Sequence, residues 1–321
     1  MLAPLSPVLT ATLPWLTHAN NAQRLNILTY HRVLAQPDAF RTAEPTADVF
    51  DWQMRLLATH FTPLSLADAL AHLDAGTLPK RAVCVTFDDG YADNLSVALP
   101  ILKRWKIPAT VFVSTDFLNG GRMWNDTVIE SVRRFEGDQL VLREYDLPVL
   151  DMRNYQAKRT ALREIIIAIK HRPQIQRSAA VDALAAQVND LPNDLMMSDQ
   201  QVQQMSEAGV EIGAHTLSHP ILTTLDDATL EREITGSRAY LQNLLDKPIR
   251  YFAYPNGKRG PDYGQRERDL VEQLGFAATL STNWAVAHPG SDRWQLPRFT
   301  PWDKDPLKFH LRLLLNYRNP G

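Results

Sequence analysis

The stretch AVCVTFDDG at residues 82–90 indicates how this chain folds. Residues 82–87 form an apolar run with β-branched members, which is typical of a buried strand. Two carboxylates, Asp88 and Asp89, follow at once. Adjacent carboxylates at a partly buried strand end are costly unless their charges are compensated. The stretch therefore predicts a strand of a covered sheet, with either a chemical site or an ordinary helix cap at its carboxyl end.

Strand and helix patterns alternate on both sides of this stretch. The predicted strands, each a short apolar run, lie at 25–30, 82–87, 109–113, 210–214, 251–254, 276–280 and 296–299. Helical spacing of apolar residues between these runs predicts covering helices, and such alternation is typical of a parallel α/β sheet. The interval 119–200 breaks the alternation with three helical patterns, so we interpret it as a helical insertion.

Composition excludes several classes of protein. The 321 residues are 45% hydrophobic, which argues against intrinsic disorder. The 34 Lys and Arg against 36 Asp and Glu give a net charge of −2, so we expect no binding of nucleic acid by phosphate neutralisation. A single cysteine, Cys84, rules out an internal disulfide and a cysteine metal cluster. No apolar stretch approaches the length of a transmembrane helix.

The two ends of the chain are predicted to be accessory parts, outside a barrel at 25–305. We expect residues 1–24 to form an N-terminal arm, because prolines interrupt their apolar run and no Lys or Arg precedes Arg24. A secretory signal needs a basic start and an unbroken apolar run, so the expected location is cytoplasmic or peripheral to the membrane. Residues 306–321 are expected to form an amphipathic helix docked on the barrel, with a membrane-surface contact as the alternative.

A second polar motif, HTLSHP at 215–220, follows another predicted strand. His215 and His219 can converge on one ion, and Pro220 disfavours helical geometry at the residue before it, which favours a compact loop. Ordinary surface histidines are the alternative. Two imidazoles and one carboxylate from residues 88–89 make a ligand set for a divalent ion with an open position. The other carboxylate is then free to accept a proton from metal-bound water, which predicts metal-assisted hydrolysis.

These motifs resemble those of the polysaccharide deacetylases, the NodB-homology domain of carbohydrate esterase family 4. TFDDG at 86–90 resembles the family's first motif, HTLSHP its second, and YPNG at 254–257 falls where the third ends. The form FAYP at 252–255 resembles the poly-N-acetylglucosamine deacetylase branch. The resemblance spans roughly residues 25–300 and implies a distorted (β/α)₇ TIM-like barrel with the helical insertion at 119–200.

The resemblance also implies roles for individual residues. Asp88 matches the catalytic base, and the Asn256 backbone N–H would help to hold the oxyanion. The matching metal ligands are Asp89, His215 and His219, with Zn²⁺ expected and Co²⁺, Ni²⁺ or Fe²⁺ as alternatives. Trp124 could stack on a sugar ring or anchor the insertion. The residues expected to contact substrate are Tyr91, Trp124, Asn125, Tyr254 and Pro255.

Two positions depart from the family pattern. Ala253 stands where an Arg normally pairs with the catalytic Asp, so we expect Asp88 to lack that partner and the metal alone to lower its pKa. The fifth motif normally supplies a His as general acid, but the matching region reads LPRF at 296–299. His31, at the end of the first strand, is the better-placed candidate for that role, and His288 is the other.

Three functions follow from these features. The leading hypothesis is a metal-dependent hydrolase that removes N-acetyl groups from amino sugars in a polysaccharide, oligosaccharide or glycolipid. A second keeps the chemistry but takes a small cyclic amide or ureide as substrate. A third is a non-catalytic carbohydrate-binding barrel, which the missing Arg and His favour and the complete set of Asp and His residues opposes.

Overall fold

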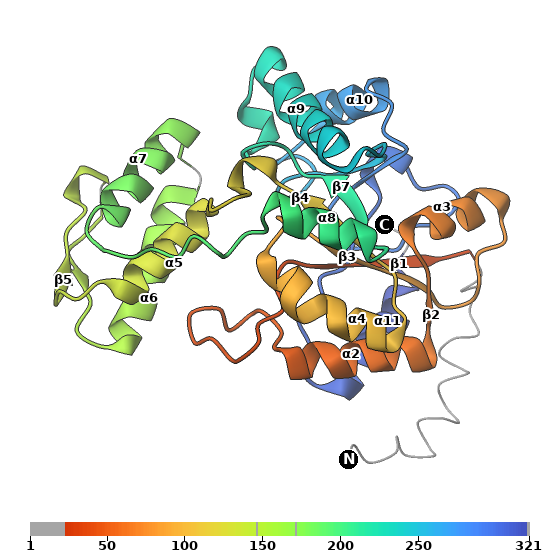
Figure 1. The fold of residues 1–321 in the computed structure, drawn as a ribbon, viewed down its shortest axis with the longest axis horizontal. Helices are drawn as coiled ribbons and strands as arrows, with labels where there is room; N and C mark the ends of the chain where they lie inside the picture. The colour runs from red at the N-terminus through yellow and green to blue at the C-terminus, as the bar shows by residue number, and fades with distance from the viewer. Residues whose placement is uncertain (1–22, 146, 171, 320–321) are drawn as a thin grey trace.

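The computed structural model describes residues 23–145, 147–170 and 172–319, so almost all of the predicted arm at 1–24 lies outside the described residues. Its centre is a seven-stranded sheet in the order β1-β3-β4-β7-β8-β9, with β2 also paired to β3 (Figure 1). Every pairing in this sheet is parallel, as the alternation of strands and helices predicted. The strands are β1 (Leu25–Tyr30), β2 (Thr62–Pro63), β3 (Ala82–Phe87), β4 (Ala109–Val113), β7 (Glu211–Ala214), β8 (Tyr251–Ala253) and β9 (Ala278–Leu280).

Helices cover the outer face of the curled sheet (Figure 1). Alternate residues of β3 serve the two faces: Val83, Val85 and Phe87 join the large apolar core under the helices, while Ala82 and Cys84 join a second core on the other face. The same alternation directs Thr86 and Asp88 to the face opposite the helices. The covering helices are α2 (Ala47–His60), α4 (Leu99–Trp105), α8 (Asp199–Glu207), α9 (Asp227–Leu245), α10 (Gln265–Gln273) and α11 (Pro306–Asn316). Helix α3 (Leu66–Ala75) packs on the second core instead.

The predicted strand at 296–299 is not a regular strand. It makes single parallel bridges, Leu296 with Leu280 of β9 and Phe299 with Leu28 of β1. Pro297 between them has no N–H to donate, which interrupts the ladder. The segment nevertheless lies between β9 and β1, and its side chains divide between the two faces: Leu296 joins the second core, and Phe299 joins the core under the helices.

The segment predicted as a helical insertion forms a lobe beside the sheet (Figure 1). Its helices are α5 (Trp124–Arg134), α6 (Tyr155–Lys170) and α7 (Gln174–Ala185). A short antiparallel pair that the sequence did not predict, β5 (Gln139–Leu140) with β6 (Leu150–Asp151), lies among them. The lobe has an apolar core of its own, with buried residues from all three helices. The lobe therefore packs mainly on itself and not on the sheet.

Helix α11 packs against helix α2. Asp305 caps its start, and Phe309, Leu313 and Leu314 are buried. The Phe309 ring packs edge-on against Trp52 of α2, with ring centroids 5.5 Å apart. No helix in the described part of the chain is long and apolar enough to cross a membrane.

Candidate metal and hydrolase site

Asp89, His215 and His219 converge at the carboxyl edge of the sheet. Asp89 follows β3 and the two histidines follow β7. The Nε2 atoms of both imidazoles lie 3.5 Å from Asp89 Oδ1, and one ligand atom from each residue lies within 4.8 Å of the others. His215 Nδ1 donates to the Ala253 carbonyl oxygen at 2.7 Å, which fixes the tautomer that leaves Nε2 free. The cluster has the geometry of a three-ligand metal site.

The chemistry of these donors fits a cation. Asp89 Oδ1 is buried and accepts no hydrogen bond from the described residues, a state that is costly for an anionic oxygen without a positive partner. Burial would raise the pKa of Asp89, but the adjacent histidines hold it well below its usual range. Burial lowers the pKa of His219 to about 4, so its Nε2 lone pair is available at neutral pH. Asp89 and His219 are thus in the protonation states that metal binding requires.

Several residues at this edge have strained backbones. Asp89, Thr216, His219 and Asn256 have φ values of 75°, 67°, 53° and 58°. Positive φ is uncommon for residues other than glycine, and it is a true outlier for the β-branched Thr216. Such strain persists only where the surrounding structure over-determines it, and it gathers at functional sites.

Asp88 forms a buried, bidentate ion pair with Arg298. The distances are 2.7 Å from Nη1 to Oδ1 and 2.7 Å from Nη2 to Oδ2. Arg298 Nε donates to the Ser281 carbonyl oxygen at 2.9 Å, and Thr29 Oγ1 donates to Asp88 Oδ2 at 3.4 Å. Burial would raise the pKa of Asp88, but the guanidinium beside it makes the net shift downward. The carboxylate is therefore ionised and held in a fixed orientation.

This pair corrects the expectation drawn from Ala253. Asp88 does have a cationic partner, supplied by the segment 296–299 instead of by the motif at β8. Sequence reasoning noted Arg298 only as the position where a His was missing. The available signal was its place in a strand-like segment: Arg298 is two residues after Leu296 and one before Phe299, so it shares the face of Leu296 and lies opposite to Phe299.

His31 lies at the carboxyl end of β1, as predicted. Its carbonyl oxygen accepts a hydrogen bond from Asn94 Nδ2 at 2.9 Å. Burial acts to lower the pKa of His31, but the negative charges of Asp89, Asp88 and Glu44 outweigh it and raise the pKa. The ring therefore lies in the electrostatic environment of the carboxylates Asp88 and Asp89.

The alternative candidate, His288, lies at the other end of the barrel. Its neighbour Ala287 pairs with Leu25, the first residue of β1, whereas His31 follows the last. Its own Nδ1 accepts the Gly290 N–H at 3.0 Å within a local turn. A β-strand advances about 3.3 Å per residue, so six residues of β1 separate His288 from the site by roughly 20 Å. The prediction of a catalytic role for His288 is wrong.

Asn256 offers a backbone donor at the same edge. Its carbonyl oxygen accepts Thr282 Oγ1 at 2.7 Å, and the following residue, Gly257, also has a positive φ of 76°. Within the described residues the Asn256 N–H donates to no protein acceptor. The turn thus presents a free N–H in a preset direction, which is the requirement for stabilising an oxyanion.

Two tyrosines predicted to contact substrate are buried instead. Tyr91 is 3% exposed, and its hydroxyl donates to Asp126 Oδ2 at 2.7 Å. Tyr254 is fully buried, stacks on Tyr263 with ring centroids 3.8 Å apart, and donates its hydroxyl to the Trp294 carbonyl oxygen at 2.8 Å. Pro255 is buried beside it. These contacts let the three residues support the loops of the site, and their contact with substrate stays a prediction.

Trp124 and Asn125 open helix α5 of the insertion. The Trp124 ring is partly buried against the apolar core of the lobe and has the Arg177 guanidinium 5.2 Å from its centroid. These contacts favour the anchoring alternative, and sugar stacking by Trp124 stays a prediction. Asn125 is partly exposed, and its Oδ1 has no hydrogen-bond partner among the residues described. Its contact with substrate stays a prediction.

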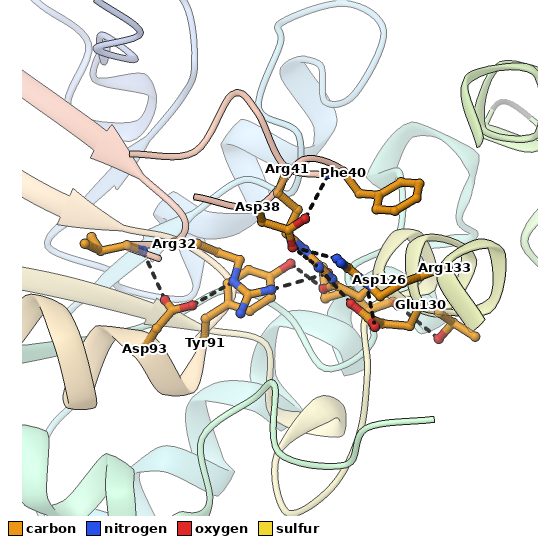
Figure 2. Close-up of polar contacts among 12 residues, drawn as sticks. Arg32, Asp38, Phe40, Arg41, Tyr91, Asp93, Asp126, Glu130 and Arg133 are labelled. Carbon is orange, nitrogen blue, oxygen red and sulfur yellow. Dashed lines mark hydrogen bonds and ion pairs between the residues drawn. The ribbon is translucent and has the colours of Figure 1, made fainter. Parts of the chain in front are cut away.

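A buried network of charges joins the site to the insertion (Figure 2). Arg32, next to His31, binds Asp93 at 2.7 Å. Arg41 binds both Asp126 and Glu130 of α5, each at 2.7 Å. Sequence reasoning missed this network because its members come from three separated segments. It fixes the start of α5 against the loop that follows β1.

The fold and the site together define a class of protein. The chain belongs to the polysaccharide deacetylase family, whose family model matches residues 75–279. The resemblance drawn from TFDDG and HTLSHP is thereby confirmed.

Individual relatives agree with this assignment. A poly-beta-1,6-N-acetyl-D-glucosamine N-deacetylase of Staphylococcus aureus is 33% identical over 106 residues, which are 33% of this chain and 37% of that protein. The match thus spans about a third of the relative's length. Among solved structures, the Streptococcus pyogenes deacetylase PplD in complex with acetate has a TM-score of 0.60 at 20% identity, covering 91% of this chain and 98% of that one. IcaB from Ammonifex degensii has a TM-score of 0.58 at 21% identity, covering 92% and 97%. Both structures share the fold.

Proposed function

We propose that this chain is a metal-dependent hydrolase that removes N-acetyl groups from amino sugars in a polysaccharide, oligosaccharide or glycolipid. The observation that carries the proposal is the convergence of an Asp–His–His cluster with a separate ionised carboxylate, Asp88, at one edge of the sheet. Family membership and the N-deacetylase name of the Staphylococcus aureus relative support this substrate class.

Each residue has a distinct part in this reaction. Asp89, His215 and His219 would hold a divalent ion, for which Zn²⁺ is the first choice and Co²⁺, Ni²⁺ or Fe²⁺ the alternatives. When bound, the ion supplies Lewis-acid activation of a water and of the acetyl carbonyl. Asp88 accepts the proton of the attacking water, and the Asn256 N–H donates to the oxygen on which charge develops. His31 donates a proton to the leaving amine.

The other two functions have less support. The non-catalytic barrel rested on a missing Arg and a missing His, and Arg298 now supplies the cation beside Asp88. The small cyclic amide or ureide has no feature of the site in its favour. The test of the proposal is acetate release from a panel of N-acetyl sugars and oligomers, with and without added divalent metal. Hydrolysis of a cyclic ureide in preference to every N-acetyl sugar would contradict it.

Two further statements belong to this proposal. We infer that the sheet is a distorted (β/α)₇ barrel in which the segment 296–299 acts as the closing element, supported by its bridges to both β9 and β1. The cytoplasmic or membrane-peripheral location and a surface contact of α11 with a membrane stay predictions.

Replacing either histidine ligand should remove the ion. We expect purified wild-type protein to carry about one divalent ion per chain, and His215→Ala or His219→Ala to carry almost none, because a three-ligand site keeps too few ligands after one is lost. Elemental analysis of the purified proteins measures this. The matched control is His288→Ala, which changes a histidine at the opposite end of the barrel and should keep the ion. Unchanged metal content in both ligand variants would remove the proposed site.

Replacing His31 should affect amides more than esters. An amine leaves as a neutral molecule only after it gains a proton, so His31→Ala should lower kcat/KM on an N-acetyl sugar by about 10²–10⁴-fold, the usual contribution of a general acid. The alkaline limb of the pH–rate profile should disappear, while a matched acetate ester is affected less. Wild-type amide rates at every pH in the variant would leave His31 with a structural role.

A further inference from the structure

The loop between the two histidines contacts helix α9, where one carboxylate accepts three of its hydrogen bonds. Glu233 Oε2 accepts the backbone N–H groups of Leu217 at 3.0 Å and Ser218 at 2.9 Å. Glu233 Oε1 accepts the Ser218 hydroxyl at 2.7 Å. The Glu233 side chain is buried, and no Lys or Arg within the described ranges forms an ion pair with it. Its two carboxylate oxygens therefore bind this loop and are not shared with a cationic side chain of the described residues.

The loop needs such support because its backbone is strained on both sides of these contacts. Thr216 and His219 have φ values of 67° and 53°, and they flank Leu217 and Ser218. Within the loop, Thr216 Oγ1 accepts the His219 N–H at 3.0 Å. Left-handed geometry at a β-branched residue is unfavourable unless surrounding contacts impose it. The Glu233 carboxylate makes three of the external contacts that hold the middle of the loop; the Leu217 N–H also approaches the Glu233 carbonyl oxygen at 3.2 Å, and the Asp116 N–H donates to the Leu217 carbonyl oxygen at 3.0 Å.

Helix α9 also approaches the loop closely at a glycine. Gly236 lies three residues after Glu233, on the same face of the helix. A Cβ at Gly236 would lie 2.8 Å from Leu217 Cδ1, closer than side chains pack. The helix thus approaches the loop closely at Gly236 while Glu233 binds its backbone.

We propose that Glu233 is a positioning residue for the metal site: it holds the loop so that His215 and His219 both direct Nε2 at Asp89. The inference rests on the proposed function, because it assigns a role within the same metal site. Groups that orient metal ligands typically contribute 10- to 100-fold to metal affinity. Glu233 acts through the backbone between the ligands, so its removal should make the positions of both His215 and His219 less fixed.

The test measures Zn²⁺ affinity of the metal-free full-length protein by competition with a chelating indicator. We expect Glu233→Ala to weaken binding by about 10- to 100-fold. Glu233→Gln should weaken it less, because the carboxamide oxygen can still accept both backbone N–H groups. Gly236→Ala should also weaken it, because it displaces Leu217 while leaving the carboxylate in place.

The control separates positioning from general stability. Glu267 is another buried glutamate, which accepts the Gly264 N–H at the start of α10, outside the site. Glu267→Ala should lower the Tm of the metal-free protein, as Glu233→Ala does, but leave Zn²⁺ affinity within about two-fold, since it contacts no ligand loop. If Glu233→Ala does not fold, Glu233→Gln and Gly236→Ala carry the test.

The outcomes distinguish this inference from the function on which it rests. Wild-type protein that binds no Zn²⁺, Co²⁺, Ni²⁺ or Fe²⁺ would overturn the metal site itself. Wild-type protein that binds Zn²⁺, with variants at Glu233 and Gly236 of equal affinity, would overturn only the positioning role. Equal loss of affinity in Glu233→Ala and Glu267→Ala would overturn it as well, because a loss of general stability would then explain both.

Discussion

Asp88→Asn is expected to lower kcat by about 10²–10⁴-fold while the protein keeps its metal ion. A carboxamide does not accept the proton of the attacking water, and Asp88 is not one of the three clustered ligands. Asp89→Asn should instead lose metal and activity together, because Asp89 Oδ1 faces both imidazoles. Acetate release and elemental analysis on the same preparations measure the two effects.

This comparison has a clear contrary result. Equal loss of metal from both variants would make Asp88 a ligand and place the general base elsewhere. Because Asp88→Asn leaves the Arg298 guanidinium without its anion, thermal unfolding should be recorded beside the kinetics. The loss of turnover must persist at temperatures where the variant is fully folded.

Arg298→Met is expected to destabilise the protein by about 3–5 kcal/mol at neutral pH, because it leaves the buried Asp88 carboxylate without its partner. Urea unfolding at 25 °C measures the change in the free energy of unfolding. The matched control is Arg104→Met, which removes an ion pair to Asp51 of the same 2.7 Å length on the surface. That pair should contribute only about 0–1 kcal/mol.

The same variant has a pH signature. Arg298 makes the folded-state pKa of Asp88 lower than its unfolded value, so the pair adds stability above the unfolded pKa and loses it as the pH falls through the folded pKa. The stability difference between wild type and Arg298→Met should therefore be full at pH 7 and shrink below about pH 4. The acid limb of activity should move to higher pH in the variant. A difference that is the same at pH 3 and pH 7 would show that the charge of Asp88 is not what Arg298 compensates.

The sequence predicted those parts of the site that lie in short motifs at strand ends. Asp89, His215 and His219 follow directly from β3 and β7, and parallel strands bring their carboxyl ends to one edge. The order of strands and the helical insertion were predictable for the same reason, because each has its own local pattern. The short strand β2 was missed because two residues are too few to show the alternating pattern of a strand.

The sequence did not predict contacts made across long separations. Arg298 meets Asp88 across 210 residues, and no local pattern indicates such a partner. Asp93 shows the same difficulty, because its carboxylate binds Arg32 and the Val33 N–H, both far away in the sequence. Tyr91 and Tyr254 lie beside motif residues in sequence, and the turns at the strand ends direct them into the protein. Closeness in sequence to a catalytic residue does not decide which way a side chain points.

The place of Arg298 in the chain has a consequence for shortened forms of the enzyme. Residues 75–279, the part that the family model matches, contain all three metal ligands and Asp88 but neither Arg298 nor His31. A fragment with these ends would also lose β1, and β3 would become an exposed edge. The residues that would bind the ion and the residue that lowers the pKa of Asp88 thus lie in different parts of the sequence. Trimming the carboxyl end inside residue 298 should alter the acidity of the base without changing any residue that holds the ion.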